Sequence, residues 1–154
     1  MTERETTPYE SAQLILELYE LRRDPELRSA RDWFVNRFHP TSADDVLARW
    51  MGPESAGYRM VTSYWEMAAS LVVHGAIDDA MFRDANSEYI AVIAKLAPFL
   101  AELRATTRQP HYLQHLESIV TRMPDSATRL ENMRRYMKMK RDAAAAVSAS
   151  PAGA

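Results

Sequence analysis

The chain has 154 residues, of which 47% are hydrophobic and 26% charged, with four glycines and no cysteine. This composition excludes disulfides, thiolate metal ligands and a cysteine nucleophile, and four glycines leave little material for a glycine-rich phosphate loop. It favours a single all-helical domain, because Ala, Leu, Met, Glu and Arg form helices well and the length suffices for one substantial core.

No part of the sequence predicts a membrane segment. The first ten residues carry charges where a signal peptide needs an apolar core. The longest uncharged internal stretch, 67–77, is far shorter than the roughly 20 residues that span a bilayer. Because the lack of cysteine is also typical of reducing compartments, we expect a cytoplasmic protein without a membrane partner.

The first two predicted helices begin at capping signals. Thr7 and Glu10 flank Pro8 in the order of a capping box, and an apolar stripe follows. Asp24, directly before a proline, ends that periodicity and can cap the second helix. The residues expected to face inward are Leu14, Ile15, Leu18 and Leu21 in the first helix and Leu27, Ala30, Phe34 and Phe38 in the second.

A short third helix and a long fourth helix are predicted next. Thr41 or Ser42 can cap the third, which ends at a Gly-Pro pair. The fourth runs over about 57–74 with a broad apolar face, and Gly75 can close it in the left-handed conformation. Asp78 can then cap a fifth helix, so the sequence between them predicts a tight turn.

Three helical segments are predicted in the second half of the chain. A fifth helix is expected over about 79–97 with Ala85 facing inward, and Pro98 either kinks it or starts a new helix. Pro110 is expected to open a sixth helix. Asp125 or the serine that follows it caps the last one, which carries a stripe of Leu and Met.

The end of the sequence sets the predicted domain organisation. Beyond Asp142 the run AAAAVSASPAGA has no large apolar anchor, so we expect the last helix to fray there. The prediction is therefore an all-α fold over residues 1–142, a compact bundle of six to seven helices with antiparallel neighbours, followed by a flexible Ala/Ser/Pro tail over 143–154.

Two groups of polar residues could carry chemistry in the middle of the chain. Glu66, Ser70 and His74 are four residues apart and lie along one ridge of the fourth helix, as paired acid-base groups would. The ridge lies opposite the apolar stripe, so we interpret it as solvated or facing an interface. The Asp pairs at 44–45 and 78–79 fall at helix starts, where capping and the helix dipole account for them.

His111 and His115 are the nearest thing to a metal motif. Their spacing would place both rings on one face of a helix, where they could clamp a metal ion. No Glu-x-x-His or Asp-x-x-His pattern completes the site, so we predict neither a metal ion nor another cofactor. The sequence names no catalytic residue, and a metal-binding enzyme is only an alternative interpretation.

Charge is distributed unevenly along the chain. Residues 122–141 hold seven Lys/Arg against two Asp/Glu, a net charge of +5, and residues 1–121 hold twelve against eighteen, a net charge of −6. A basic segment can bind nucleic acid or an acidic partner, although cations near a helix C-terminus also complement its dipole. The candidate interaction residues are Trp33, Trp50, Arg134, Arg135, Lys138 and Arg141.

Three segments in this order resemble a known family. They are LYELRRDPELRSARDWF, YWEMAASLVVHGAIDDAMF and IAKLAPFLAELRATTRQPHYLQHLESI. Together they are similar to a family of small bacterial all-helical proteins known only as a domain of unknown function, over about residues 10–122. The resemblance implies a helical fold and a bacterial origin, and it transfers no catalytic residue.

These observations predict a function in binding. We expect a non-enzymatic protein interaction or self-assembling helical module whose partner is another protein or a second copy. The alternative is a nucleic-acid-associated protein that uses the basic C-terminal helix. The sequence leaves open the biological process, the partner and the oligomeric state.

Overall fold

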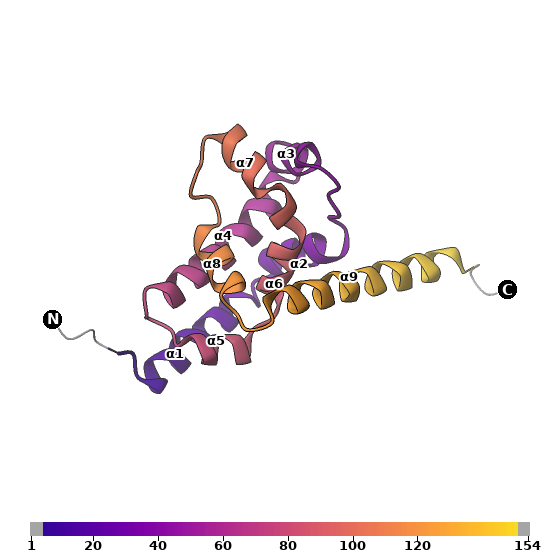
Figure 1. Cartoon of the computed structure of the whole chain (residues 1–154). Helices are drawn as coiled ribbons and strands as arrows, with labels where there is room; N and C mark the ends of the chain where they lie inside the picture. Colours follow the sequence, from indigo (N-terminus) through magenta and orange to yellow (C-terminus); the bar gives the residue numbers. More distant parts are fainter. Residues whose placement is uncertain (1–4, 151–154) are drawn as a thin grey trace.

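The computed structural model describes residues 5–150, and all the regular structure in that range is helical (Figure 1). The all-α prediction is therefore confirmed, but the helices are shorter and more numerous than the six to seven expected. They are α1 Pro8–Leu21, α2 Pro25–Asn36, α3 Ala43–Met51, α4 Ser55–Val73, α5 Asp79–Ala85, α6 Glu88–Leu96, the 3-10 turn η1 Ala97–Phe99, α7 Leu100–Thr107, α8 Gln114–Thr121 and α9 Ser126–Ala149.

Local capping signals place most helix starts where the sequence predicts them. The Thr7 side chain accepts the N–H of Glu10 at 3.2 Å, and the Glu10 carboxylate accepts the N–H of Thr7 at 2.9 Å, which completes the capping box. Asp24 and Asp78 cap α2 and α5 in the same way through their side chains. Such caps fix a helix start because they satisfy N–H groups that have no partner within the helix.

Two turns also agree with the sequence in their backbone geometry. Gly75 has φ 78°, the left-handed conformation predicted for the end of α4. Of the two candidates for the third cap, Ser42 accepts the N–H of Asp45 at 3.1 Å. Thr41 instead donates its N–H and hydroxyl to the Asp45 carboxylate. The backbone N–H groups of both Thr41 and Asp45 are therefore hydrogen-bonded at the start of α3.

The prediction of one helix over 79–97 is wrong. The chain leaves the helix at Asn86, whose backbone is extended, and begins again at Glu88. The Asn86 side chain donates to the Phe82 carbonyl at 3.1 Å, which gives the chain an alternative to a continued helix. Ala85, expected to face inward, is exposed as a result. Pro98 lies in the 3-10 turn, so it separates two helices rather than kinking one.

Two further expectations fail at helix ends. The segment after Pro110 is not helical until Gln114, because Leu113 has a left-handed backbone with φ 56°. In α1 the inward stripe stops at Leu18, and Leu21 is exposed. Local periodicity did not reveal either change, because both depend on packing against neighbouring helices, which a pattern within one segment does not contain.

The core surrounds α4, which packs against α2, α3 and α8. Trp65 of α4 is fully buried and lies 6.5 Å from the ring of Phe82 and 6.0 Å from that of Tyr89. Burial of each such ring stabilises the fold by roughly 1.5–3 kcal/mol. Arg31 of α2 and Glu88 of α6 join two helices at the edge of this core by paired hydrogen bonds of 2.7 and 2.8 Å.

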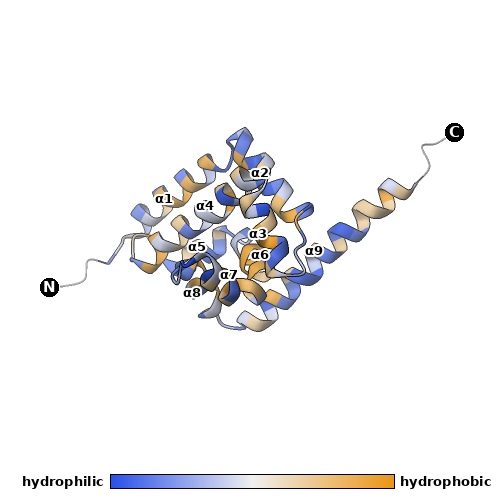
Figure 2. Ribbon diagram, turned by 90° about the horizontal axis from the view of Figure 1, so that it is seen from above, coloured by the Kyte–Doolittle hydropathy of each residue, from blue (hydrophilic) through white to orange (hydrophobic). Residues whose placement is uncertain are grey.

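Helix α9 is only half attached to the body. Its first half packs on α6 and α2 through Leu130, Met133 and Met137, and its second half runs out beyond the body (Figure 2). The sequence predicts fraying after Asp142, but the helix continues to Ala149. The flexibility predicted for 143–154 stays a prediction, and its last four residues lie outside the described range.

Candidate functional site

Glu66 of α4 holds the start of α8. Its carboxylate accepts the backbone N–H groups of His115 at 3.0 Å and Leu116 at 2.9 Å, and it lies 2.8 Å from the ring Nδ1 of His115. Leu113, at the N-cap position of α8, offers no side-chain acceptor. Glu66 therefore provides a cap from another helix, and its charge is favourable at a helix N-terminus.

The ridge that contains Glu66 is thus partly covered by the chain itself. Ser70 is half-buried and donates to the carbonyl of Met67, while His74 at the end of α4 is exposed. The rings of His74 and His115 lie side by side, with centroids 5.5 Å apart. The ridge predicted as a solvated or interface-facing surface is in part an internal contact between α4 and α8.

His111 and His115, the weak metal candidates of the sequence, do not share one helical face. His111 lies in the loop before α8 and is exposed, whereas His115 is in the helix with its Nδ1 directed at Glu66. The prediction assumed one helix from Pro110, and the left-handed Leu113 breaks that helix. Across residues 5–150, no group of three or more His, Cys, Asp or Glu is arranged to hold a metal ion.

A groove of about 690 Å³ lies beside the Glu66 contact, between α4 and the loop before α8. The rings of Trp50 and Tyr112 stack there with centroids 4.5 Å apart, and the Tyr112 hydroxyl is 2.7 Å from that of Tyr58. Burial raises the pKa of Tyr112 to about 12, so this phenol stays protonated at neutral pH. The groove can donate and accept hydrogen bonds, but its phenols do not act as bases.

Trp50, predicted as an interaction residue, presents little surface to solvent, and its role in an interaction stays a prediction. It is buried, and its ring packs on Tyr58 as well as Tyr112. Trp33 is half-buried, stacks on Phe38 at 5.2 Å and lines a shallow groove between α2 and the start of α4. Trp33 is the more accessible of the two, while Trp50 is reached only through the groove beside Tyr112.

Lys95 of α6 is a buried charge that sequence reasoning missed. It is only 8% exposed, and its Nζ donates to the carbonyls of Phe34 at 2.8 Å, Val35 at 2.9 Å and Phe38. These carbonyls lie at the C-terminal end of α2, where a cation is favourable. Burial, together with the nearby Arg141, lowers the pKa of Lys95 to about 7. A single lysine inside the apolar run IAVIAKLA was the signal in the sequence.

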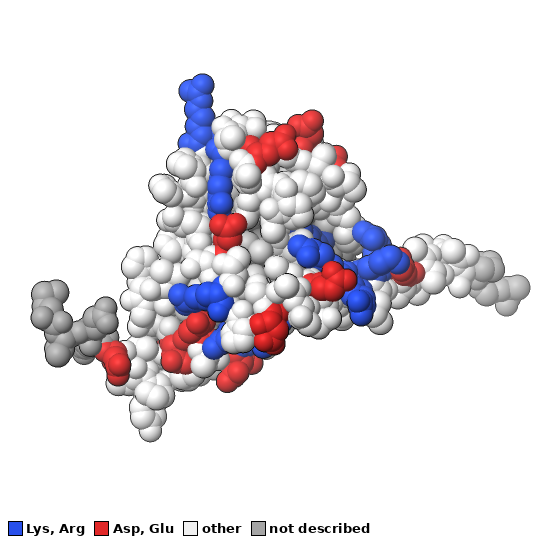
Figure 3. Space-filling model, in the orientation of Figure 1, with Lys and Arg blue, Asp and Glu red and all other residues white. Residues whose placement is uncertain are grey.

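The basic residues of α9 fall into two groups. Arg134 donates to the Ala94 carbonyl at 3.2 Å and so fastens the helix to the body. Arg135 and Lys138 remain exposed and pair within α9, with Glu131 at 3.6 Å and Asp142 at 2.8 Å. Arg141 is exposed as well. Figure 3 shows these charges gathered where α9 leaves the body.

Exposed apolar side chains mark a second surface that sequence reasoning missed. Tyr9, Leu16 and Tyr19 project from the outer face of α1, and Leu21 is exposed elsewhere on that helix. The signal was present as a second apolar periodicity in α1, beside the stripe that contains Leu18. An exposed apolar row on a helix is typical of a contact with another molecule.

The described residues thus form an all-helical domain in which charged side chains join helix ends. A family model described as "Domain of unknown function (DUF4760)" matches residues 9–123, and the chain belongs to this family. The resemblance predicted over 10–122 is confirmed in that sense. Comparisons with curated proteins and with solved structures give no significant match. The matched region ends before the start of α9 at Ser126.

The described helices can also be compared with the length and apolar character that a membrane-spanning helix needs. None of those within residues 5–150 is both long enough and apolar enough to cross a bilayer. The longest, α9, has the basic and polar composition described above over most of its length.

Proposed function

We propose that this protein is a non-enzymatic interaction module, in which the helical body presents the second half of α9 as an arm for binding another protein. The arm is defined here as residues 138–149. One observation carries the proposal: after Met137, the last buried residue of α9, twelve exposed residues continue as helix. These residues make no tertiary contacts that bury them in this chain, and most helical stability comes from packing of one face, so a partner that packs on the arm would stabilise it.

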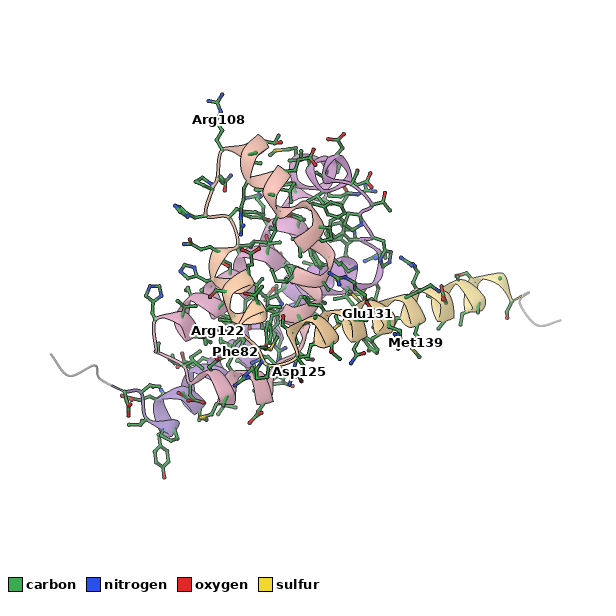
Figure 4. The ribbon with its side chains drawn as sticks, viewed as in Figure 1. Phe82, Arg108, Arg122, Asp125, Glu131 and Met139 are labelled. Atoms are coloured by element: carbon green, nitrogen blue, oxygen red, sulfur yellow. The ribbon has the colours of Figure 1, made fainter. Side chains whose placement is uncertain are left out.

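The composition of the arm supports the same function. Met139 and Val147 are exposed on it, and basic side chains stand beside them. Figure 4 shows Met139 on α9 where the helix projects from the body. Apolar side chains flanked by charges are the usual composition of a helix that packs on another helix. Since the chain lacks cysteine and resembles bacterial proteins, we place this function in the bacterial cytoplasm.

The test compares the full chain with a chain that ends after Met137. This end point removes the arm and keeps Leu130, Met133 and Met137 on α6. Tagged forms of both are expressed in the source cell together with an untagged copy, and nuclease-treated extracts are captured. We expect a stoichiometric protein, which can be the untagged copy, on the full chain only. Equal capture by both forms would contradict a binding role for the arm.

Nucleic acid is the second candidate partner, favoured by the exposed Lys138, Lys140 and Arg141. A phosphate-binding arm would show affinity for duplex or single strands that falls steeply with salt. Replacing these three residues by glutamine would abolish that binding. A result of this kind would assign the arm to nucleic acid instead of protein.

A further inference from the structure

The groove beside Glu66 has the size and the lining of a small-molecule site. Its volume of about 690 Å³ falls within the roughly 300–1,000 Å³ that such sites occupy. The side chains that line it come from Trp50 at the end of α3, from one ridge of α4 and from the loop 109–113 before α8. All of them lie within the family-matched region and none belongs to the arm, so the groove is independent of the proposed function.

The floor of the groove presents mainly aromatic surface. The hydroxyls of Tyr58 and Tyr112 are 2.7 Å apart, and the Thr62 hydroxyl donates to the Tyr58 carbonyl at 2.9 Å. These polar groups therefore already have partners inside the protein. The ring of Tyr112 is only half-buried and stacks on that of Trp50, so part of it stays open to a flat ring in the groove.

The acidic side chain in the lining is already occupied. Of the described residues that line the groove, only Glu66 carries a carboxylate. That carboxylate accepts the N–H groups of His115 and Leu116 and lies 2.8 Å from the His115 ring. Glu66 therefore has little capacity left to bind a cationic ligand.

Arg59 on the same ridge of α4 is in the opposite situation. Its Nε donates to the Ser55 hydroxyl at 3.2 Å, which steadies the side chain and leaves the two terminal nitrogens free. No carboxylate within residues 5–150 lies within ion-pair distance of it. A guanidinium with free terminal nitrogens binds a carboxylate through two parallel hydrogen bonds. The groove therefore offers a positive charge without an internal counter-ion.

The loop on the other side of the groove adds further donors. Gln109 and His111 are exposed and line the groove, and neither side chain has a hydrogen-bond partner among the residues that the structure describes. The glutamine amide and the imidazole ring can each donate an N–H to a ligand oxygen. The polar groups left free in the lining are thus suited to a ligand that carries an anion.

We propose that this groove binds a small planar aromatic carboxylate. Its ring lies beside the stacked rings of Trp50 and Tyr112, and its carboxylate lies on Arg59. The aromatic floor selects the flat apolar part of the ligand, and the unpaired guanidinium selects its charge. A cationic ligand of the same shape would find no free carboxylate, because Glu66 is engaged by α8.

The experiment uses naphthoate as the probe, a two-ring aromatic carboxylate, with the full chain. Naphthamide, which has the same rings without the charge, and cyclohexanecarboxylate, which has the charge without a flat ring, are the comparison compounds. Isothermal titration calorimetry measures the affinities. The indole N–H signals in an assigned NMR spectrum report the place of binding, because the three tryptophans lie in different surroundings.

We expect naphthoate to bind about tenfold more tightly than either comparison compound, the size of one charge-assisted hydrogen bond or one good ring contact. Arg59→Gln should lower the naphthoate affinity about tenfold and leave that of naphthamide unchanged. Arg28→Gln is the matched control, since Arg28 is another exposed helical arginine, lies outside the groove lining and has no ion pair among the described residues. It should change neither affinity.

The indole signals should respond selectively. Naphthoate should shift the N–H signal of Trp50, which lines the groove. The signal of Trp65, whose indole N–H donates to Glu88 at 3.3 Å, should stay in place. So should that of Trp33, which lines the separate groove beside α2.

Four results would overturn the inference. The first is no saturable binding of naphthoate up to millimolar concentration, and the second is equal affinity for either comparison compound. The third is a loss in Arg28→Gln as large as that in Arg59→Gln. The fourth is a shift at Trp33 in place of Trp50, which would put the ligand in the other groove. None of these results affects the proposed function, because its test depends on the arm alone.

Discussion

Two helix ends inside the body are each held by a charged side chain from another helix. The start of α8 is held by the carboxylate of Glu66, and the end of α2 by the ammonium of Lys95. The signs follow the helix dipole, which favours an anion at an N-terminus and a cation at a C-terminus. The surroundings differ, because Glu66 is half-buried at the edge of a groove and Lys95 is enclosed.

This difference shows how burial changes the free-energy cost of placing a charged side chain at a helix end. At the groove edge, water helps to solvate the Glu66 charge. Around Lys95 the phenyl rings of Phe34 and Phe38 and the body of α6 exclude it, and burial lowers the pKa of the lysine. The carbonyl contacts then serve two purposes, since they satisfy the end of α2 and partly compensate the desolvated charge.

The largest expected effect is that of Lys95→Met at pH 9. At this pH the amine is mostly neutral in the folded state, and methionine of similar size removes its hydrogen bonds to the α2 carbonyls. Leaving these buried carbonyls without donors should cost about 3 kcal/mol of unfolding free energy. Urea unfolding followed by circular dichroism measures it. Lys138→Met, which changes an exposed lysine, is the control and should change the free energy by less than about 0.5 kcal/mol.

The same substitution should behave differently at lower pH. The pKa of Lys95 is about 7 in the folded protein against 10.5 ordinarily. Between these values the unfolded chain binds more protons, so the stability of the unchanged protein rises with pH by up to about 1.4 kcal/mol per unit. The effect of Lys95→Met should therefore shrink from pH 9 to pH 6. An effect of equal size at both pH values would mean that the lysine keeps its ordinary pKa.

These two contacts also show which parts of the fold the sequence could predict. The caps at Thr7, Asp24 and Asp78 were predicted because each acceptor lies within three residues of its donor. Glu66 and His115 are 49 residues apart, and nothing local brings them together. Periodicity also placed Glu66 correctly outside the apolar stripe but could not reveal that α8 covers that side.

The misplaced helix ends have a similar cause. Asn86 ends α5 with a hydrogen bond from its side chain to a backbone carbonyl. Asparagine can make such a bond in any helix, and here it accompanies a turn that the neighbouring elements require. Leu113 adopts a left-handed backbone, which leucine rarely does unless surrounding contacts enforce it. Because this one residue interrupts the expected helix, His111 and His115 do not share the helical face that the metal hypothesis assumed.

Glu66→Ala should have the next largest effect after the lysine variants. It leaves the first N–H groups of α8 without their acceptor, and it should cost about 2 kcal/mol, the upper end for a lost cap. Glu66→Gln keeps an acceptor oxygen but no charge, so about half of that loss is expected. Denaturant unfolding at pH 8 measures both. Glu131→Ala, at an exposed carboxylate of α9, is the control, and a loss as large as that of Glu66→Ala would show that Glu66 is no special contact.

A change in ionic strength should have the smallest of these effects on stability, and the effect should differ between the Glu66 and Lys95 contacts. Raising the ionic strength from about 0.1 to 1 M shortens the screening length from about 10 Å to 3 Å, which weakens charges that water can reach. The difference between Glu66→Gln and the unchanged chain should fall by a few tenths of a kcal/mol, the size of an exposed charge–dipole interaction. The difference caused by Lys95→Met at pH 6, where the lysine is charged, should stay constant because the site is enclosed. Equal salt sensitivity of both differences would imply that solvent reaches Lys95 as freely as it reaches Glu66. The contrast between an enclosed and a solvent-accessible helix end would then be wrong.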